Sequence, residues 1–462
     1  MTKTSGESSL FGRISRLIQP FSAYLVGGAV RDKLLGIPTH DLDFALPERT
    51  LQAAKLVADQ LGGAYYVLDE QRNAARVVVG ADPLSRQSVD FTTFQGPDLI
   101  ADLKSRDFTI TAMAVDLDQP DILIDPLGGA ADLRRGVIKS CSPCSIEEDP
   151  IRALRAVRMA VDFNFRIQKE TQNQIRDNVE KLERVSPERL RDEVFRMITC
   201  KSPAAAFRVV NTLGITPQLF PGAKTISSIR IQTLVNLEKF WKLLGEEYAP
   251  GEAADLISGQ LVTRLGRYRD RLSSHLNNEL VWERNVRSLI NLAGLSSDPG
   301  DKDSANDLFI STIDRFKLST QEKERLILTR QAAEVFRSLP DAGSLAALDA
   351  YRYFRAYSAA GIDGVFLALA DYLSETAGQP GPEGWRERLD RARFLLESWW
   401  EKTGERVSPP VLVDGHLLMA ELELEPGPII GELLENIREA QVKGQVSTAG
   451  EALERARKIL EG

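Results

Sequence analysis

The spacing of apolar residues divides the chain into two kinds of structure. Between residues 21 and 140, short β-rich segments at 75–79, 88–93, 112–117 and 122–124 alternate with helical patterns such as 51–61. From about residue 147 the apolar positions recur at helical spacing, and strand signals nearly vanish. Because strand and helix periods differ, this change predicts an α+β head followed by a long helical region.

Glycine- and proline-rich breaks at 295–305, 376–384 and 406–410 subdivide the helical region. We expect five parts: an N-terminal arm at 1–20, a head at 21–140, a helical neck at 141–210, a helical body at 211–405 and a C-terminal helical region at 406–462.

Composition narrows the class of protein. The chain has 462 residues, 43% of them hydrophobic, and a net charge of −8, which argues against a uniformly basic nucleic-acid binder. The charge is uneven, because residues 151–240 hold sixteen Lys and Arg against nine Asp and Glu. This local basic surface suits phosphate binding. With three cysteines and no apolar run of about 20 residues, a cytoplasmic protein without a membrane span is expected.

The strongest chemical signal lies between residues 25 and 44. An apolar strand runs into Gly27-Gly28, a short helix carries Arg31, and a second strand carries Asp41 and Asp43. Side chains alternate along a strand, so the two carboxylates share one face. Glycine admits an anion close to the backbone, and a helix N-terminus attracts phosphate. The pattern therefore favours Mg²⁺ and a nucleoside triphosphate.

Further motifs follow along the chain in a fixed order. They are Lys104-Ser105-Arg106-Asp107-Phe108-Thr109-Ile110-Thr111-Ala112, Asp125-Pro126-Leu127-Gly128-Gly129, Glu148-Asp149-Pro150-Ile151-Arg152-Ala153-Leu154-Arg155-Ala156-Val157-Arg158 and Ser186-Pro187-Glu188-Arg189-Leu190-Arg191-Asp192-Glu193. Together with the segment at 25–44 they resemble the tRNA nucleotidyltransferase and bacterial poly(A) polymerase family. The C-terminal segments at 413–419 and 427–434 resemble that family as well.

The resemblance implies a polymerase-β-like nucleotidyltransferase head on a helical neck, body and tail. It implies that Asp41 and Asp43 are the catalytic metal ligands for Mg²⁺, and that the neck selects the base while the C-terminal region binds tRNA. The nucleotide-binding residues would be Gly27, Gly28, Arg31, Arg106, Asp107, Asp149, Arg152, Arg155 and Arg158.

Base selection has a physical basis in the third motif. Asp149 and Arg152 are three residues apart on an expected helix and would share a face, which Arg155 continues. A carboxylate and a guanidinium can match the pairing edge of cytosine or adenine. An ordinary surface ion pair is the alternative. The segment around residue 107, which by resemblance selects the ribose, departs from the family at Ser105 and Thr111, where relatives have Arg and Asn. A threonine hydroxyl can still bond a ribose 2′-OH, but it offers less than an amide. Asp107 could serve the ribose or pair with Arg106.

The expected activity is template-independent transfer of CMP and AMP from CTP and ATP to the tRNA 3′ end. The partners are the acceptor end of tRNA, CTP and ATP, with no DNA and no membrane. An A-adding enzyme, a poly(A) polymerase and an inactive RNA-binding homologue are the alternatives. The family's flexible loop would fall at 95–101, where the connection is short and contains Pro97. By resemblance, this loop helps the pocket change from C to A. A short loop therefore predicts an enzyme that adds only CC, unless the flexible segment lies elsewhere, for example at 81–87.

Overall fold

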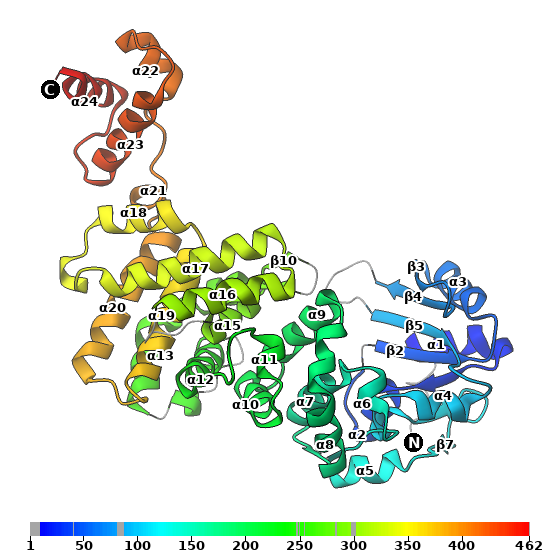
Figure 1. The fold of residues 1–462 in the computed structure, drawn as a ribbon. Coiled ribbons are helices and arrows are strands. Elements are labelled where there is room, and N and C mark those ends of the chain that lie inside the picture. The colour runs from blue at the N-terminus through cyan, green and yellow to red at the C-terminus, as the bar shows by residue number, and fades with distance from the viewer. Residues whose placement is uncertain are drawn as a thin grey trace. The chain divides into compact units, whose positions relative to one another are not determined.

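A computed structural model describes residues 10–461 except 40, 81–86, 246–247, 249, 254, 282–283 and 297–301, and it leaves out the side chains of 250, 252 and 302–308. The chain forms two compact units (Figure 1). The first comprises 1–196 and 209–218, and the second comprises 197–208 and 219–462. The five-part division expected from the sequence is finer than these two units, and it stays a prediction.

A mixed seven-stranded sheet forms the centre of the first unit, in the order β3-β4-β5-β2-β1-β6-β7. Strands β2 and β5 run parallel, and the other neighbouring pairs in the sheet run antiparallel. The strands are β1 (Tyr24–Val26), β2 (Asp41–Leu46), β3 (Ala64–Asp69), β4 (Ala74–Val79), β5 (Gln87–Thr93), β6 (Ala114–Asp116) and β7 (Leu123–Ile124). The α+β head expected from the apolar pattern is thereby confirmed.

One face of the sheet is apolar and packs against helices α1 (Leu10–Ile18) and α3 (Thr50–Leu61). Phe44 and Phe91 stack on neighbouring strands, and Phe11 of α1 stacks on Phe44. Because side chains alternate along β2, burying Leu42 and Phe44 turns Asp41 and Asp43 to the opposite face. The hydrophobic face thus fixes where the carboxylates point.

The remaining elements of the first unit are mostly short helices. Helix α2 (Gly28–Leu35) follows the double glycine, and α4 (Leu99–Ser105) follows β5. The others are α5 (Gly129–Arg135), β8 (Val137–Ile138), α6 (Ser145–Glu148), α7 (Arg152–Asp162), β9 (Arg166–Ile167), α8 (Lys169–Asn178) and α9 (Pro187–Ile198). Strands β8 and β9 pair in parallel, so a short ladder interrupts the expected helical neck.

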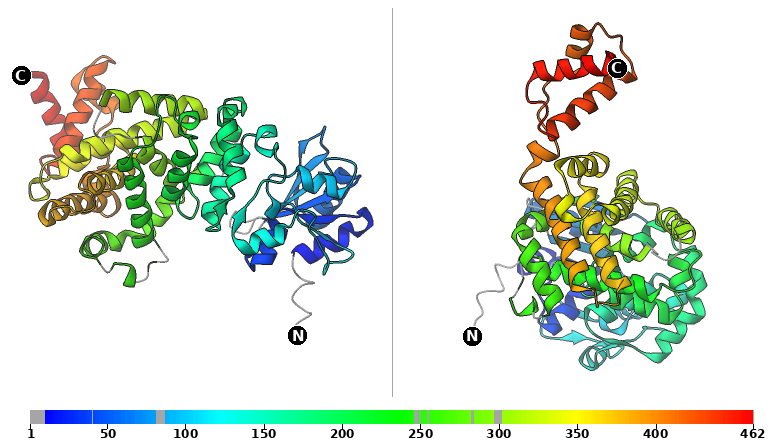
Figure 2. Two further views of the ribbon diagram at one scale, coloured as in Figure 1. Left: turned by 60° about the horizontal axis from the view of Figure 1, so that its bottom comes forward. Right: turned by 90° about the vertical axis from the view of Figure 1, so that its left-hand side faces the viewer.

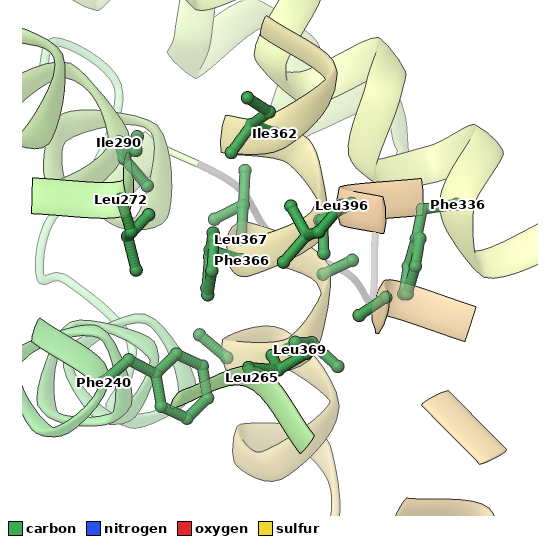
Figure 3. Close-up of a cluster of buried hydrophobic side chains, with 14 of the residues drawn as sticks. Phe240, Leu265, Leu272, Ile290, Phe336, Ile362, Phe366, Leu367, Leu369 and Leu396 are labelled. Carbon is green, nitrogen blue, oxygen red and sulfur yellow. The ribbon is translucent and has the colours of Figure 1, made fainter. Parts of the chain in front are cut away.

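The second unit is built around α19 (Ala360–Glu375), which is buried along almost all of its length. Phe366, Leu367 and Leu369 of α19 point into a core that includes Phe240 and Leu265 (Figure 3). The surrounding helices include α12 (Ser228–Leu243), α13 (Leu256–Leu265), α14 (Arg269–Leu276), α15 (Val286–Ser296), α17 (Thr320–Ser338), α18 (Ala347–Tyr357) and α20 (Pro382–Trp400). The predominantly helical body is as expected.

Three C-terminal helices have a small core of their own (Figure 2, orange to red). They are α22 (Gly415–Leu422), α23 (Pro428–Val442) and α24 (Ala449–Glu461). Leu418, Leu433 and Ile437 are buried between them. Across the described ranges, no helix is both long and apolar enough to cross a bilayer.

Candidate active site

A cavity of about 510 Å³ opens within the first unit, over the polar face of the sheet. It is bounded by β1, β2, β5, α4, α7 and α9. Its lining is mostly charged: Asp43, Asp90, Asp102, Asp107, Asp149, Asp192, Glu193, Arg106, Arg152, Arg155, Arg189 and Arg196. A concave site with convergent charges of both signs suits a charged ligand that also offers hydrogen bonds.

The carboxylate of Asp43 lies at the floor of this cavity beside Asp90. The two residues are in register on the parallel strands β2 and β5. Burial and the negative charge of Asp90 raise the pKa of Asp43 to about 6. Arg76 holds Asp90 through two hydrogen bonds of 2.7 and 2.8 Å. Asp41 is exposed at the start of β2, where it accepts a hydrogen bond from the Ser88 hydroxyl, and it does not line the cavity.

Gly27 lies in the turn between β1 and α2, next to the carboxylate of Asp43. Its φ is +72°, and a Cβ there would lie 3.0 Å from Oδ2 of Asp43 and 3.2 Å from Nη1 of Arg106. The backbone conformation therefore favours glycine, and a Cβ here would press against both charged side chains. Gly28 begins α2, whose free N–H groups start at this point.

Arg106 is fixed beside Asp43 by a residue that sequence reasoning missed. Buried Asp102 accepts hydrogen bonds from Nε and Nη2 of Arg106 at 3.2 and 3.0 Å. Its other oxygen accepts from the backbone N–H of Gln95 at 2.8 Å. The Asp102 carboxylate thus positions the guanidinium of Arg106 and anchors the loop between β5 and α4.

That loop spans only Phe94 to Asp98, and several contacts pin it in place. Asp98 caps α4 by accepting a hydrogen bond from the N–H of Ala101 at 2.8 Å. A Cβ at Gly96 would lie 2.8 Å from the Ala101 side chain. The loop is therefore short and closely packed. The alternative position predicted for the flexible segment, 81–87, lies outside the described residues except for Gln87.

Asp107 pairs with Arg155, and the suggested pair with Arg106 is wrong. Nε and Nη2 of Arg155 both lie 2.8 Å from Oδ2 of Asp107. Burial raises the pKa of Asp107, but Arg155 and the hydroxyl of Thr111 outweigh it and lower the pKa below its usual value. The Thr111 hydroxyl is buried against Asp107, so it acts on the cavity through that carboxylate.

The expectation that Asp149 and Arg152 share one helix is wrong. Asp149 is an extended residue between α6 and α7, and α7 begins only at Arg152. Proline at position 150 disfavours helix at the residue before it. Asp149 accepts a hydrogen bond from Arg189 of α9 at 2.8 Å. Arg152 donates to the carbonyls of Ser105 and Ser145, yet both Asp149 and Arg152 line the cavity.

Two other predicted arginines lie outside the lining. Arg31 pairs with Asp32 at 2.8 Å and lies 4.4 Å over the ring of Phe163. Arg158 pairs with Glu193 of α9. Asp90, Asp102 and Arg189 are lining residues that the sequence reasoning missed. The alternation at 88–93 carried a signal for Asp90, but only the pairing of β5 with β2 puts it beside Asp43.

Comparison with known proteins identifies the family. Residues 23–139 match the poly A polymerase head domain, and residues 164–226 match a probable RNA and SrmB-binding site of polymerase A. Residues 409–456 match the second domain of tRNA nucleotidyltransferases. A CC-adding tRNA nucleotidyltransferase of Geobacter sulfurreducens is 30% identical, over 94% of this chain and 90% of its own. The chain belongs to the tRNA nucleotidyltransferase family.

The relatives match nearly the whole chain, but they differ in activity. An A-adding tRNA nucleotidyltransferase of Deinococcus radiodurans is 29% identical, over 94% of each chain. A solved CCA-adding enzyme in complex with ATP shares the fold, with a TM-score of 0.66 and 23% identity over 98% of this chain and 95% of its own. The resemblance read from the motifs is thus confirmed, and the head on a helical body is the fold of this family.

Proposed function

We propose that the protein adds nucleotides to the 3′ end of tRNA, transferring CMP and AMP from CTP and ATP. The observation that carries the proposal is the buried Asp43 beside Asp90 in a cavity that Arg106, Arg152 and Arg155 also line. Carboxylates and guanidinium groups that line one cavity suit a metal-bound triphosphate with a selected base. The place of this reaction in tRNA maturation supports a cytoplasmic enzyme.

The donor set of the site fits Mg²⁺. Asp41 and Asp43 offer oxygen ligands from one face of β2, and the like charge of Asp90 adds to the demand for a cation. In the described part of the chain, no three His, Cys, Asp or Glu side chains gather as a metal site. This agrees with an ion that takes its other ligands from phosphate and water. The bound metal would neutralise charge on the transferring phosphate.

The chain's own residues would orient the nucleotide. Arg106, fixed by Asp102, lies close to Asp43, where it would donate hydrogen bonds to phosphate oxygens. Asp149, held by Arg189, offers an acceptor to an exocyclic amino group, as cytosine and adenine carry. Arg152 has its guanidinium plane fixed by backbone carbonyls and can donate to a ring acceptor. Template-independent choice of C and A follows from these two side chains.

Base choice is testable by substitution. Arg152→Ala is expected to reduce discrimination among the four nucleoside triphosphates about tenfold, since a base-edge contact contributes about 1–3 kcal/mol. Arg106→Ala is expected to weaken all four alike, because it serves the phosphates. The ratio of kcat/KM values for CTP, ATP, UTP and GTP measures both effects. An unchanged ratio in Arg152→Ala would exclude Arg152 from base selection.

We further propose that the protein adds two cytidines efficiently and the terminal adenosine poorly. The support is the five-residue loop from Phe94 to Asp98, pinned by Asp102 and Ala101, which leaves little freedom for a change of pocket from C to A. The relative of Deinococcus radiodurans keeps the A-adding alternative open. A poly(A) polymerase would need only ATP and would accept generic RNA.

One assay separates these activities. With tRNA lacking its last three nucleotides and with CTP and ATP together, sequencing of the 3′ ends should show accumulation at the CC stage. Quantitative extension to CCA would refute the CC-only proposal and leave CCA addition standing. Extension only of tRNA that already ends in CC would identify an A-adding enzyme. Equal extension of generic RNA with ATP alone would identify a poly(A) polymerase, and no incorporation would favour an inactive RNA-binding homologue.

A further inference from the structure

A continuous row of residues crosses the polar face of the sheet from the active site to its edge. Asp43 of β2 is in register with Asp90 of β5, Asp90 with Arg76 of β4, and Arg76 with Tyr66 of β3. Residues in register on neighbouring strands point to the same side of a sheet. Tyr66 therefore lies on the face that carries the catalytic carboxylate.

Tyr66 is an aromatic residue in an exposed position. It is 54% exposed, and β3 is the edge strand of the sheet. Three inter-strand steps of about 4.8 Å place its Cα about 14 Å from that of Asp43. A short single strand whose 3′ end lies at Asp43 can cover this distance.

A positive charge lies between the aromatic ring and the carboxylates. The Arg76 side chain is 42% exposed while it holds Asp90. Aromatic side chains on which bases stack, next to cations that follow the phosphates, are the usual means of binding single-stranded nucleic acid without reading its sequence. Tyr66 and Arg76 provide one of each in adjacent strands.

The position of the nucleotide cavity indicates from which side the acceptor strand would approach Asp43. Among the described residues, those that line the cavity come from β1, β2, β5, α4, α7, α9 and the adjoining loops, and none comes from β3 or β4. The attacking and leaving oxygens of a phosphoryl transfer lie roughly in line on opposite sides of the phosphorus. With the triphosphate in the cavity, the attacking hydroxyl would reach Asp43 from the side of β4 and β3.

We propose that Tyr66 is a stacking platform for the unpaired nucleotides that precede the reacting 3′-hydroxyl, and that Arg76 contacts a phosphate between them. The inference rests on the proposed function, because it takes the occupant of this face to be the acceptor end of tRNA. It adds a binding site for the primer strand on β3 and β4, separate from the site for the incoming nucleotide.

The test compares three variants. Tyr66→Ala is expected to raise KM for tRNA that ends in the first added C about tenfold, as loss of one base–aromatic stack would, with KM for CTP unchanged. Tyr66→Phe should behave as wild type, because the ring remains. Val67→Ala is the matched control, since Val67 is also exposed but is in register with buried Ala75 on the opposite face. It should leave both constants unchanged.

Stacking itself can be observed with tRNA that ends in the first added C and carries 2-aminopurine as its penultimate nucleotide. Binding to wild type and to Tyr66→Phe should quench the fluorescence, and binding to Tyr66→Ala should quench it less. If wild type extends tRNA but Tyr66→Ala matches Val67→Ala in KM and in quenching, the platform is refuted while the proposed function stands. A change only in oligomeric state by light scattering would also refute it, in favour of self-association through the β3 edge. A wild-type protein that does not extend tRNA would refute the proposed function itself.

Discussion

Asp43→Asn is expected to lower the rate of nucleotide addition at least about 1000-fold, equivalent to about 4 kcal/mol of transition-state stabilisation. Asparagine keeps the shape of the side chain but removes the charge that would hold the metal. Of the carboxylates on β2, Asp43 lines the cavity and Asp41 does not, so no other carboxylate of this strand can replace it there. Single-turnover incorporation of CMP into tRNA lacking its last three nucleotides measures the loss.

The matched control is Asp59→Asn, the same change on the exposed side of α3. It should retain wild-type rates. Binding of tRNA to Asp43→Asn, measured by filter retention, should stay within about twofold of wild type because the RNA contacts are assigned to other residues. Near wild-type turnover in Asp43→Asn would disprove the metal assignment. Loss of tRNA binding together with activity would indicate a structural role instead.

Asp363→Ala is expected to destabilise the second unit by about 3–5 kcal/mol, as removal of one partner from a buried ion pair does. Asp363 of α19 is fully buried and accepts hydrogen bonds from His275 at 2.6 Å and from Arg325 at 2.5 and 3.0 Å. Without the carboxylate, the guanidinium of Arg325 remains in the interior without its counter-charge. Urea denaturation followed by tryptophan fluorescence measures the change, because all five tryptophans lie between residues 241 and 400.

The pH dependence gives this prediction a second readout. Burial raises the pKa of Asp363, but His275 and Arg325 outweigh burial and lower it below its usual value. A lowered carboxyl pKa contributes stability that is present above the unfolded pKa, about 3.9, and is lost as the pH falls through the folded value. Wild type should therefore lose stability below about pH 4 more steeply than Asp363→Ala. Exposed Asp314→Asn is the control, and equal midpoints in all three proteins would disprove the role.

Local motifs carried most of the catalytic assignment. The spacing of Asp41 and Asp43, with Gly27-Gly28 before them, predicted two carboxylates on one face of a strand next to a glycine turn, and β2 and Gly27 have that arrangement. The alternation of polar and apolar residues is enough for this inference, because it acts between neighbours in the sequence. The change from strand to helical periodicity likewise predicted a head followed by helices.

Contacts between distant segments could not be read in this way. The pairing of Asp107 with Arg155, and of Asp149 with Arg189, joins residues 48 and 40 positions apart. Helical spacing suggested Asp149 and Arg152 on one face, but the proline that follows Asp149 ends the helical geometry there. Local rules fail at these positions because each charge pairs with the partner that the fold brings near, whatever the distance along the chain.

By itself, then, the sequence determined the class of the fold, the position of the carboxylate pair on β2 and the family. These depend on residue spacing within single elements and on motifs in a fixed order. Only the tertiary structure decided that Asp90 lies beside Asp43, that Asp102 fixes Arg106, and that the row across the sheet ends at Tyr66. The physical reason is that strand order and register are set by packing of the whole sheet, where a shift of one residue would turn each side chain to the other face.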